Sequence, residues 1–498
     1  MLIENFSFIF VSHSKPLTMI AFKKIIAASI IAIIAIPFFL SAKVQLPSFF
    51  SDGMVLQQQT NASVWGWAKQ NAAVKIITSW NKKSYSAIAD GNGKWMMKIA
   101  TPVAGGPYSI SISDGDPVMI KNILIGEVWL CSGQSNMEMP MKGFRDQPIM
   151  GSNDAVFNSA NDQIRIYTVP RAVERFAKDT SKNAAWKNAS PENISNFSAT
   201  AYYFGRLLQQ QLKIPVALIN VSYGGSPAEA FMSGESLKLF PEIIVPSATG
   251  TEKLNNKNAT TLYNGMIHPV MGFTIKGCLW YQGESNYERP DQYEKLFAAM
   301  VQLWRSEWGQ GNFPFYFAQI APYTYNYAGN KTEKMNSAYL RDAQRKAAAA
   351  IPNSGIVVLM DAGEDKSIHP ANKEVVGKRF AYLALGDTYL FKGFAFQSPA
   401  YDSLIVKDSM ATIKFKFAPN GLTSFGKTIT QFEIAGADKN FFPAQVLIRN
   451  GTVQLTSPQV LKPVAIRYAF KDFVNGEMFS TEGFPVSSFR TDDWTPVP

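Results

Sequence analysis

Hydrophobic and polar residues alternate in the first part of the chain. Tyr108, Ile110 and Ile112 are each followed by a serine, and this two-residue period is typical of a half-buried β-strand. An Asp-Gly-Asn-Gly sequence at residues 90–93 predicts a hairpin turn between two strand-like runs. We therefore expect residues 43–120 to form a small β-sandwich.

The same alternation returns near the end of the chain. Ile413, Phe415 and Phe417 are separated by lysines, and a Pro-Asn-Gly turn follows at residues 419–421. We expect residues 393–498 to form a second β module, packed on the part of the chain that precedes it.

Between these modules, over residues 121–392, short apolar runs alternate with helical patterns. Phe204, Leu207 and Leu208 have the spacing of one helix face. The apolar runs lie at residues 123–131, 216–221, 277–281, 315–320 and 356–360. Strands separated by helical crossovers predict an α/β fold with a doubly wound parallel sheet. Residues 141–196 show no clear period, and we expect them to form long loops.

Residues 1–42 have the pattern of a secretory signal peptide. Lys23 and Lys24 precede an apolar run at residues 25–40, and two small residues that suit cleavage follow. The run is short for a membrane span and contains Pro37. We expect the mature chain to be exported to the periplasm or the extracellular space, without a membrane anchor.

Composition narrows the function classes. The 498 residues are 46% hydrophobic and 17% charged, as in folded globular proteins. The net charge of +10 is not concentrated in a basic run interleaved with aromatic residues, so a nucleic-acid partner is not expected. The only cysteines, Cys131 and Cys278, lie in apolar runs and are expected to be buried free thiols. With three histidines, none at metal-ligand spacing, no metal site is expected.

One stretch, GEVWLCSGQSNMEMP at residues 126–140, joins a buried strand to a polar turn. The apolar run ends at Cys131, and small or polar residues follow as far as Asn136. Sites in open α/β sheets lie at the carboxyl ends of the strands, so Ser135 is placed where a nucleophile would be useful. An ordinary Ser-Gly turn before a helix is the alternative interpretation of this stretch.

Three further polar stretches follow predicted strands: SYGGSP at residues 222–227, WYQGESN at 280–286 and DAGEDKSIHP at 361–370. A serine becomes an effective nucleophile when a neighbouring base takes its proton, and the oxyanion that then forms needs preorganised N–H donors. Gly224 and Gly225 can supply backbone donors, and Gln282 or Asn286 a side-chain amide. Together with Ser135, these stretches predict acyl-transfer chemistry at one edge of the sheet.

Two histidines share the tripeptide Ile-His-Pro, and their positions distinguish them. His369 follows a predicted strand and opens a helix, so it belongs to the same sheet edge as Ser135. His268 precedes its strand and approaches the opposite edge. Glu364 and Asp365 lie close enough to His369 to orient its ring. We therefore predict that His369 is the base.

These stretches resemble the sialate O-acetylesterase family, a branch of the SGNH (GDSL-type) hydrolases. The matching sequences are WLCSGQSNMEMP, YGGSPAEAF, LYNGMIHP, WYQGESN and SIHPANKEVVGKRFA, with LPSFFSDGMVLQQ near the start and VAIRYAFKDF and GFPVSSFRTDDW near the end. The resemblance covers nearly the whole mature chain. It implies an SGNH-type, flavodoxin-like parallel sheet flanked by β-rich modules at both ends.

Carried over residue by residue, the resemblance implies that Ser135 is the nucleophile and His369 the general base. The backbone amides of Ser135 and Gly225 and the Gln282 side chain would form the oxyanion hole. It further implies substrate-binding roles for Gln134, Asn136, Asn264, Glu284 and Asn286. It implies no cofactor and no metal.

One position departs from the family. SGNH enzymes commonly place an aspartate three residues before the histidine, where this chain has Lys366. The orienting group is then Asp365, Glu364 or a backbone carbonyl, and a Ser-His dyad and a triad with Asp365 both stay open.

The resemblance implies a secreted serine esterase that removes O-acetyl groups from sialic acids through an acyl-enzyme. An acetylesterase of plant polysaccharides such as xylan or pectin is an alternative, because loops rather than the acyl-transfer groups read the sugar. A non-catalytic carbohydrate-binding protein is an alternative of another class, disfavoured by the presence of both Ser135 and His369. The oligomeric state stays open.

Overall fold

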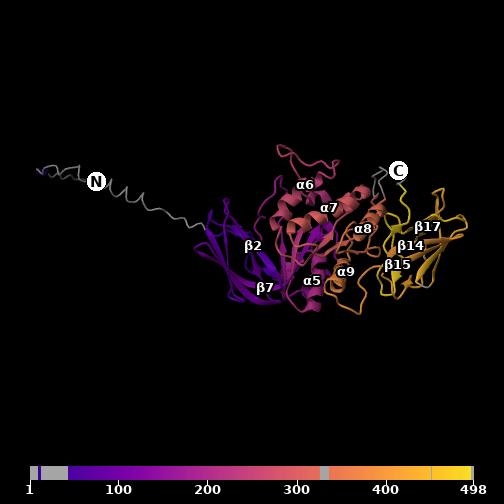
Figure 1. Cartoon of the computed structure of the whole chain (residues 1–498), viewed down its shortest axis with the longest axis horizontal. Helices are drawn as coiled ribbons and strands as arrows, with labels where there is room; N and C mark the ends of the chain where they lie inside the picture. The colour runs from indigo at the N-terminus through magenta and orange to yellow at the C-terminus, as the bar shows by residue number, and fades with distance from the viewer. Residues whose placement is uncertain (1–8, 13–42, 326–335, 450, 495–498) are drawn as a thin grey trace, which may run out of the picture.

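The computed structural model describes residues 9–12, 43–325, 336–449 and 451–494. In Figure 1 an N-terminal β module, a central part with helices around a sheet, and a C-terminal β module follow one another along the long axis of the molecule. The signal segment expected at residues 1–42 lies, but for residues 9–12, outside the described residues. Within the described ranges, no helix is long and apolar enough to cross a bilayer.

The long strand β7 (Pro117–Gly133) joins the N-terminal module to the central part. Its first half pairs antiparallel with β6 (Gly105–Ser113). Its second half pairs in parallel with β10 (Val216–Ser222) on one side and with β11 (Gly277–Tyr281) on the other. The domain boundary expected between residues 120 and 121 therefore falls inside a continuous strand.

The central sheet has the strand order β13-β12-β11-β7-β10-β8-β9. All neighbours are parallel except the edge pair β8 and β9, so the sheet is mixed. The strands not yet given are β8 (Asn161–Thr168), β9 (Lys187–Ala189), β12 (Phe315–Ala318) and β13 (Ser354–Val357). Each apolar run that was predicted as a strand in this part of the chain overlaps one strand of the central sheet. This confirms the predicted α/β arrangement.

Helices cover both faces of this sheet. Successive β7 residues enter different cores, Val128 and Leu130 on one face and Trp129 and Cys131 on the other. The first core contains α7 (Pro290–Trp308) and α8 (Ala338–Ala350), and the second contains α5 (Ala199–Leu212) and α9 (Lys373–Leu383). Because apolar residues are needed on both faces, these strands read as continuous apolar runs. Cys131 and Cys278 are free and buried, as predicted.

The expectation of long loops over residues 141–196 was wrong. This segment contains β8, which lies between β10 and β9 in the sheet, together with α3 (Ser152–Phe157) and α4 (Pro191–Ser195). Only residues 164–167 of β8 are buried, and the polar residues Asp162 and Gln163 before them are exposed. A buried run of this length gives no detectable period in the sequence.

The N-terminal module contains two sheets, as expected for a β-sandwich. In one, β6 pairs with β3, β3 with β4, and β1 joins β7; the other is the β2–β5 pair. The strands are β1 (Val55–Gln57), β2 (Asn61–Trp67), β3 (Ala73–Thr78), β4 (Ser84–Ile88) and β5 (Lys94–Ala100). Residues 90–93 do form a turn, in which Gly93 N donates to Asp90 O at 2.9 Å. The predicted hairpin was nevertheless wrong, because β4 and β5 pair with different strands and the turn connects the two sheets.

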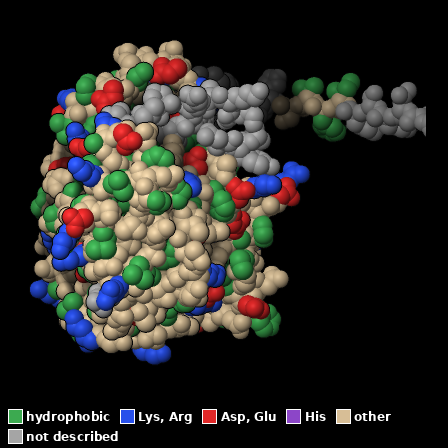
Figure 2. All heavy atoms as spheres, turned by 90° about the vertical axis from the view of Figure 1, so that its right-hand side faces the viewer, with side chains coloured by type: hydrophobic (Ala, Val, Ile, Leu, Met, Phe, Trp, Pro, Cys, Tyr) green, Lys and Arg blue, Asp and Glu red, His purple; other side chains and the backbone are tan. Residues whose placement is uncertain are grey.

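The C-terminal module consists of small antiparallel sheets with the orders β14-β15-β20-β19, β18-β17-β21-β23 and β16-β22. Its strands are β14 (Ala400–Lys407), β15 (Met410–Lys416), β16 (Leu422–Thr423), β17 (Phe432–Ala435), β18 (Phe441–Pro443), β19 (Gln445–Arg449), β20 (Thr452–Thr456), β21 (Ala465–Tyr468), β22 (Phe479–Ser480) and β23 (Phe489–Arg490). On the end of the molecule seen in Figure 2, hydrophobic side chains are scattered among charged and other side chains.

Short helical turns complete the central part. They are α2 (Ser135–Glu138), α6 (Gly234–Leu237), the 3-10 turns η1 (Ala228–Phe231), η3 (His268–Val270) and η4 (Glu284–Asn286), and the π turns η2 (Tyr263–Ile267) and η5 (Ala384–Thr388). Several of them follow strands of the central sheet, where the predicted site lies.

The C-terminal module is anchored to the central part by Arg341 of α8. This side chain is fully buried, and its guanidinium donates to the backbone oxygens of Lys471 and Asp472 and to Ser488 Oγ. Val358 and Met360, which follow β13, enter the core of the module. The module therefore packs on the central sheet through both polar and apolar contacts.

We expect Arg341→Met to lower the free energy of unfolding by roughly 2–4 kcal/mol, because buried acceptors lose a charged donor. Urea denaturation of the full chain measures the change. Lys378→Met is the control: this lysine is partly exposed and pairs with Glu374 at 3.0 Å. Surface pairs contribute only about 0–1 kcal/mol. Equal stability of the two variants would contradict the anchoring role of Arg341.

Candidate active site

Ser135 lies at the carboxyl end of β7, where the predicted site was expected. The strand ends at Gly133, whose φ is +137°, and a Cβ on this residue would lie 2.1 Å from the Tyr281 carbonyl oxygen. Only glycine allows β7 and β11 to approach so closely there. Ser135 then begins α2 and is partly exposed. Its N–H is at the first helical position and has no acceptor within the helix.

The next residue, Asn136, connects three loops of the site. Its side chain is buried, and Nδ2 donates to Glu284 Oε1 at 2.5 Å and to the Ile368 carbonyl at 3.0 Å. Its Oδ1 accepts from Lys373 Nζ at 2.5 Å. The neighbour of Ser135 is therefore hydrogen-bonded to the neighbour of His369, and the two predicted catalytic residues belong to one site.

The His369 ring is held by a hydrogen bond and an aromatic contact. Its Nδ1 lies 2.5 Å from Gln147 Oε1, and its ring makes an edge contact with Phe144 at a centroid distance of 5.4 Å. Because an amide oxygen only accepts, Nδ1 carries the proton and Nε2 keeps its lone pair. Burial, followed by the positive charge of Lys373, lowers the pKa of His369 to about 4. The imidazole is therefore neutral near pH 7 and able to accept a proton.

The structure does not bring Asp365, the predicted triad carboxylate, to Nδ1 of His369. Its carboxylate accepts from Thr324 Oγ1, and its carbonyl oxygen accepts from Thr324 N at 3.2 Å. The other acidic candidate, Glu364, accepts from Ala371 N at 2.7 Å. Both carboxylates are engaged by the loops around them, and Gln147 takes the orienting position for which the sequence offered Asp365, Glu364 or a backbone carbonyl.

Glu138 positions the predicted oxyanion loop against Ser135. Its Oε2 accepts from Gly224 N at 2.8 Å, and its Oε1 accepts from Arg171 Nε at 2.6 Å. A Cβ built on Gly224 would lie 3.2 Å from Ser135 Cβ, so the loop lies against the serine. Gly225 follows in a left-handed conformation, with φ +70°. The Ser135 and Gly225 amides are thus both at the carboxyl edge of the sheet, as predicted.

The Gln282 side chain is engaged within the protein. It is fully buried, and Nε2 donates to Ser226 O at 3.2 Å and to Asn286 Oδ1 at 2.7 Å. Its Oε1 accepts from the Tyr293 hydroxyl at 3.1 Å. Both N–H groups therefore have acceptors, and donation to an oxyanion would require one of these bonds to break. The geometry favours a positioning role for Gln282 over the predicted oxyanion role.

The residues expected to bind substrate are also bonded to protein. Gln134 Oε1 accepts from Ser285 N at 3.2 Å, and Asn286 Nδ2 donates to Glu229 Oε2 at 2.9 Å. Asn264 lies on η2, away from these bonds, and donates to the Glu174 and Arg175 carbonyls. Like Asn136 and Glu284, these side chains form hydrogen bonds that hold the loops in place. Their contact with a sugar stays a prediction.

A buried cation and a buried acid face Asn136 from opposite sides. Burial lowers the pKa of Lys373 to about 7, although Glu284 and Glu364 oppose this shift. Burial also raises the pKa of Glu284, whose Oε2 has no hydrogen-bond partner among the described residues. The sequence did not indicate a role for Lys373, because a lysine at the start of an amphipathic helix is typical of the protein surface. The sequence did not indicate a role for Gln147 either, because residues 141–196 were expected to be loops.

A strand-end serine, a neutral histidine and a glycine loop beside the serine in an α/β sheet indicate the class of ester hydrolases. Within the part of the chain that the structure describes, no group of three or more His, Cys, Asp or Glu side chains could hold a metal ion.

Comparison with known proteins agrees with this class. Residues 125–385 match the family model described as carbohydrate esterase, sialic acid-specific acetylesterase. The chain is 30% identical over 391 residues to the sialate O-acetylesterase of Homo sapiens. The aligned region covers 71% of this chain and 72% of that protein. For the sialate O-acetylesterase of Rattus norvegicus the identity is 28% over 411 residues, with coverages of 71% and 75%.

A solved structure agrees over almost the whole chain. The crystal structure of a carbohydrate acetylesterase from Xanthomonas citri superposes with a TM-score of 0.82 at 33% identity, over 91% of this chain and 100% of that one. The chain belongs to the family of sialic acid-specific carbohydrate acetylesterases, and it is a carboxylic ester hydrolase.

The pH dependence tests the state of His369. We expect kcat/KM for p-nitrophenyl acetate to fall as the pH drops through about 4, because the protonated imidazole cannot act as a base. In Lys373→Met the nearby positive charge is gone, so the pKa of His369 rises and this acid limb moves to higher pH. Lys378→Met, on the exposed side of the same helix, should keep the wild-type profile. An unshifted limb in Lys373→Met would contradict the coupling.

Gln282→Ala distinguishes positioning from direct catalysis. We expect its melting temperature to fall, because the buried groups of Ser226, Asn286 and Tyr293 lose their partner at about 1–3 kcal/mol for each unsatisfied group. Differential scanning calorimetry and steady-state kinetics measure both properties. An unchanged melting temperature with a loss of kcat of about 10²–10³ would instead indicate an oxyanion donor.

Proposed function

We propose that this protein is a secreted serine esterase that removes O-acetyl groups from sialic acids. The family description and the names of the relatives support this substrate class. The parallel order of the central strands and the helices on both faces support an SGNH-type, flavodoxin-like sheet. The pattern of residues 1–42 supports export to the periplasm or the extracellular space.

The observation that carries the proposal is the hydrogen bond from Asn136 Nδ2 to the Ile368 carbonyl, 3.0 Å long. Ser135 and His369 lie 234 positions apart in the sequence. This bond links the residues beside them across the edge of the sheet. Because Gln147 occupies Nδ1 of His369, Nε2 is the nitrogen left to receive a proton.

In the first step, Ser135 Oγ attacks the acetyl carbonyl while His369 Nε2 takes the hydroxyl proton. The carbonyl electron pair moves to oxygen, and the backbone amides of Ser135 and Gly225 donate to this oxyanion. When the tetrahedral intermediate collapses, the bond to the sugar oxygen breaks and His369 returns the proton to that oxygen. The acetyl group is then bound to Ser135, and the sugar leaves as an alcohol.

In the second step, water attacks the acyl-enzyme. His369 accepts a proton from the water, and the same amides stabilise the second oxyanion. Collapse breaks the bond to Ser135 Oγ, which recovers its proton from His369, and acetate leaves. Each cycle therefore consumes one water and needs neither a metal nor a cofactor.

Acetate release tests the substrate class. The purified mature chain is incubated with 9-O-acetylated N-acetylneuraminic acid and, separately, with acetylated xylan. Release from the sialic acid at the higher kcat/KM supports the proposal. Release from xylan alone would replace it with the polysaccharide acetylesterase alternative.

Ser135→Ala should reduce acetate release by several orders of magnitude, because loss of the nucleophile removes the acyl-enzyme route. Its melting temperature should stay close to that of the wild type, since Ser135 is partly exposed. Ser152→Ala, at the first position of α3, is the matched control and should keep full activity. More than a few per cent of activity in Ser135→Ala would exclude this serine as the nucleophile.

A further inference from the structure

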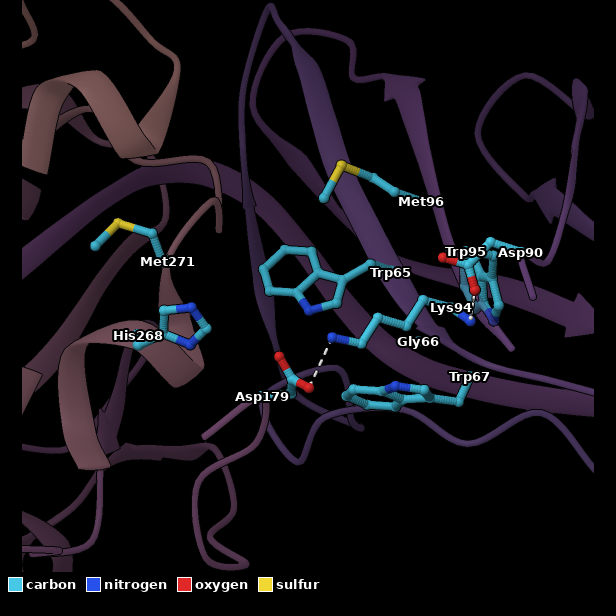
Figure 3. Close-up of a pocket in the computed structure, with 10 residues that line it drawn as sticks. All are labelled: Trp65, Gly66, Trp67, Asp90, Lys94, Trp95, Met96, Asp179, His268 and Met271. Atoms are coloured by element: carbon cyan, nitrogen blue, oxygen red, sulfur yellow. Dashed lines mark hydrogen bonds and ion pairs between the residues drawn. The ribbon is translucent and has the colours of Figure 1, made fainter. Parts of the chain in front are cut away.

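A cleft of about 440 Å³ lies between the N-terminal module and the central part. Its lining includes Trp65 and Trp67 from β2, Lys94 from β5, Asp179 from a central loop, and His268 and Met271 at η3 (Figure 3). We call this surface the tryptophan cleft. Neither Ser135 nor His369 lines it, so it is separate from the candidate active site.

The register of β2 and β5 places tryptophans where polar residues are the rule. Trp65 is opposite Met96 and Trp67 is opposite Lys94, so these side chains share the outer face of the pair. The inner face carries Val64 and other buried residues of the module core. Trp65 also packs against the hydrophobic core, whereas Trp67 on the same face is not among the described residues of that core. A large aromatic residue outside the core is informative.

The aromatic surface is rigid. The Trp65 ring packs on Phe49 and Phe50 at centroid distances of 5.2 and 4.8 Å. Both Trp65 and Trp67 are only partly buried, so their rings contribute to the walls of the cleft. A tryptophan has few rotatable bonds, so a ligand that stacks on these rings orders little additional structure.

Polar groups face the same space. Lys94 Nζ and Asp179 Oδ2 form a half-exposed ion pair of 2.7 Å, and in Figure 3 the lysine side chain extends between the two indoles toward the aspartate. His268 Nδ1 lies 2.9 Å from the Lys178 carbonyl oxygen, so it donates and Nε2 remains an acceptor. The cleft therefore offers a cation, a carboxylate and an imidazole around an aromatic wall.

This combination matches the chemistry of a pyranose ring. One face of such a ring presents C–H groups that pack on an aromatic ring, and its edge presents hydroxyls that both donate and accept hydrogen bonds. A polyphosphate or a nucleic acid would instead need several unpaired cations, and Lys94, the one lysine among the described residues that line the cleft, is paired with Asp179. The position between two parts of the chain is also typical of ligand sites.

We propose that the tryptophan cleft is a second carbohydrate-binding site, which holds sugar units of an oligosaccharide away from the ester that is cleaved. One loop connects the two sites: Arg171 bonds Glu138 beside the oxyanion loop, and Asp179 of the same loop lines the cleft. Asp179 follows Arg171 by eight residues, and eight residues of extended chain span at most about 30 Å. The Cα atoms of Arg171 and Asp179 therefore lie no farther apart than that. The inference rests on the carbohydrate esterase function of the chain.

Binding is tested on the full mature chain by isothermal titration calorimetry with 3′-sialyllactose and, separately, with xylohexaose. We expect at least one of them to bind, and Trp67→Ala to weaken that binding at least tenfold. Asp179→Asn, which keeps the side-chain shape, should weaken it also. Ile88→Ala is the control, since Ile88 is exposed on β4 of the same module and does not line the cleft.

Activity on p-nitrophenyl acetate separates this inference from the proposed function. Trp67→Ala should keep the wild-type kcat and KM for this small ester, which has no sugar for the cleft to bind. Binding of neither oligosaccharide by the wild type, or equal binding by Trp67→Ala, would overturn the second site. A wild type that binds an oligosaccharide but releases no acetate from sialic acid would overturn the proposed substrate and leave the cleft intact.

Discussion

The buried amide of Asn136 is the interaction on which the site depends. Each of its hydrogen bonds goes to a different segment: the loop after β11 through Glu284, the loop before His369 through Ile368, and α9 through Lys373. A buried amide with all partners in place fixes geometry, because losing any partner leaves a polar group unsatisfied. Ser135, the preceding residue, is positioned by this network.

Electrostatics and packing act together around that amide. Burial keeps His369 neutral, and the Lys373 charge behind it makes protonation still less favourable. Gln147, a neutral residue, orients the ring where many esterases use a carboxylate. A carboxylate at Nδ1 stabilises the imidazolium that forms during proton transfer, and among the described residues Gln147 rather than an acid has that position. Glu138 instead uses its charge to hold Arg171 and the Gly224 amide, and so fixes the oxyanion loop.

The β modules are structurally continuous with the central part. β7 belongs to both the N-terminal module and the central sheet, so the cleft lies between two parts that share a strand. At the other end, Arg341 and the residues after β13 bind the C-terminal module. A rigid connection of this kind keeps the tryptophan cleft at a constant distance from Ser135, which a bound oligosaccharide would require.

By itself, the sequence determined the order of the five apolar central strands and the strand-end location of Ser135, and it predicted His369 rather than His268 as the base, because these depend on local periodicity and chain order. It did not determine β8, whose buried run is too short to show a period, nor the pairing of β4 and β5 with different partners. Gln147, Lys373 and the engaged state of Gln282 were decided only by the tertiary structure. The hydrogen bonds of Gln147 and Lys373 join residues more than two hundred positions apart and leave no local pattern. The bonds of Gln282 depend on how its buried side chain packs. Burial, which sets the charge of a histidine or a lysine, is a property of the packed whole.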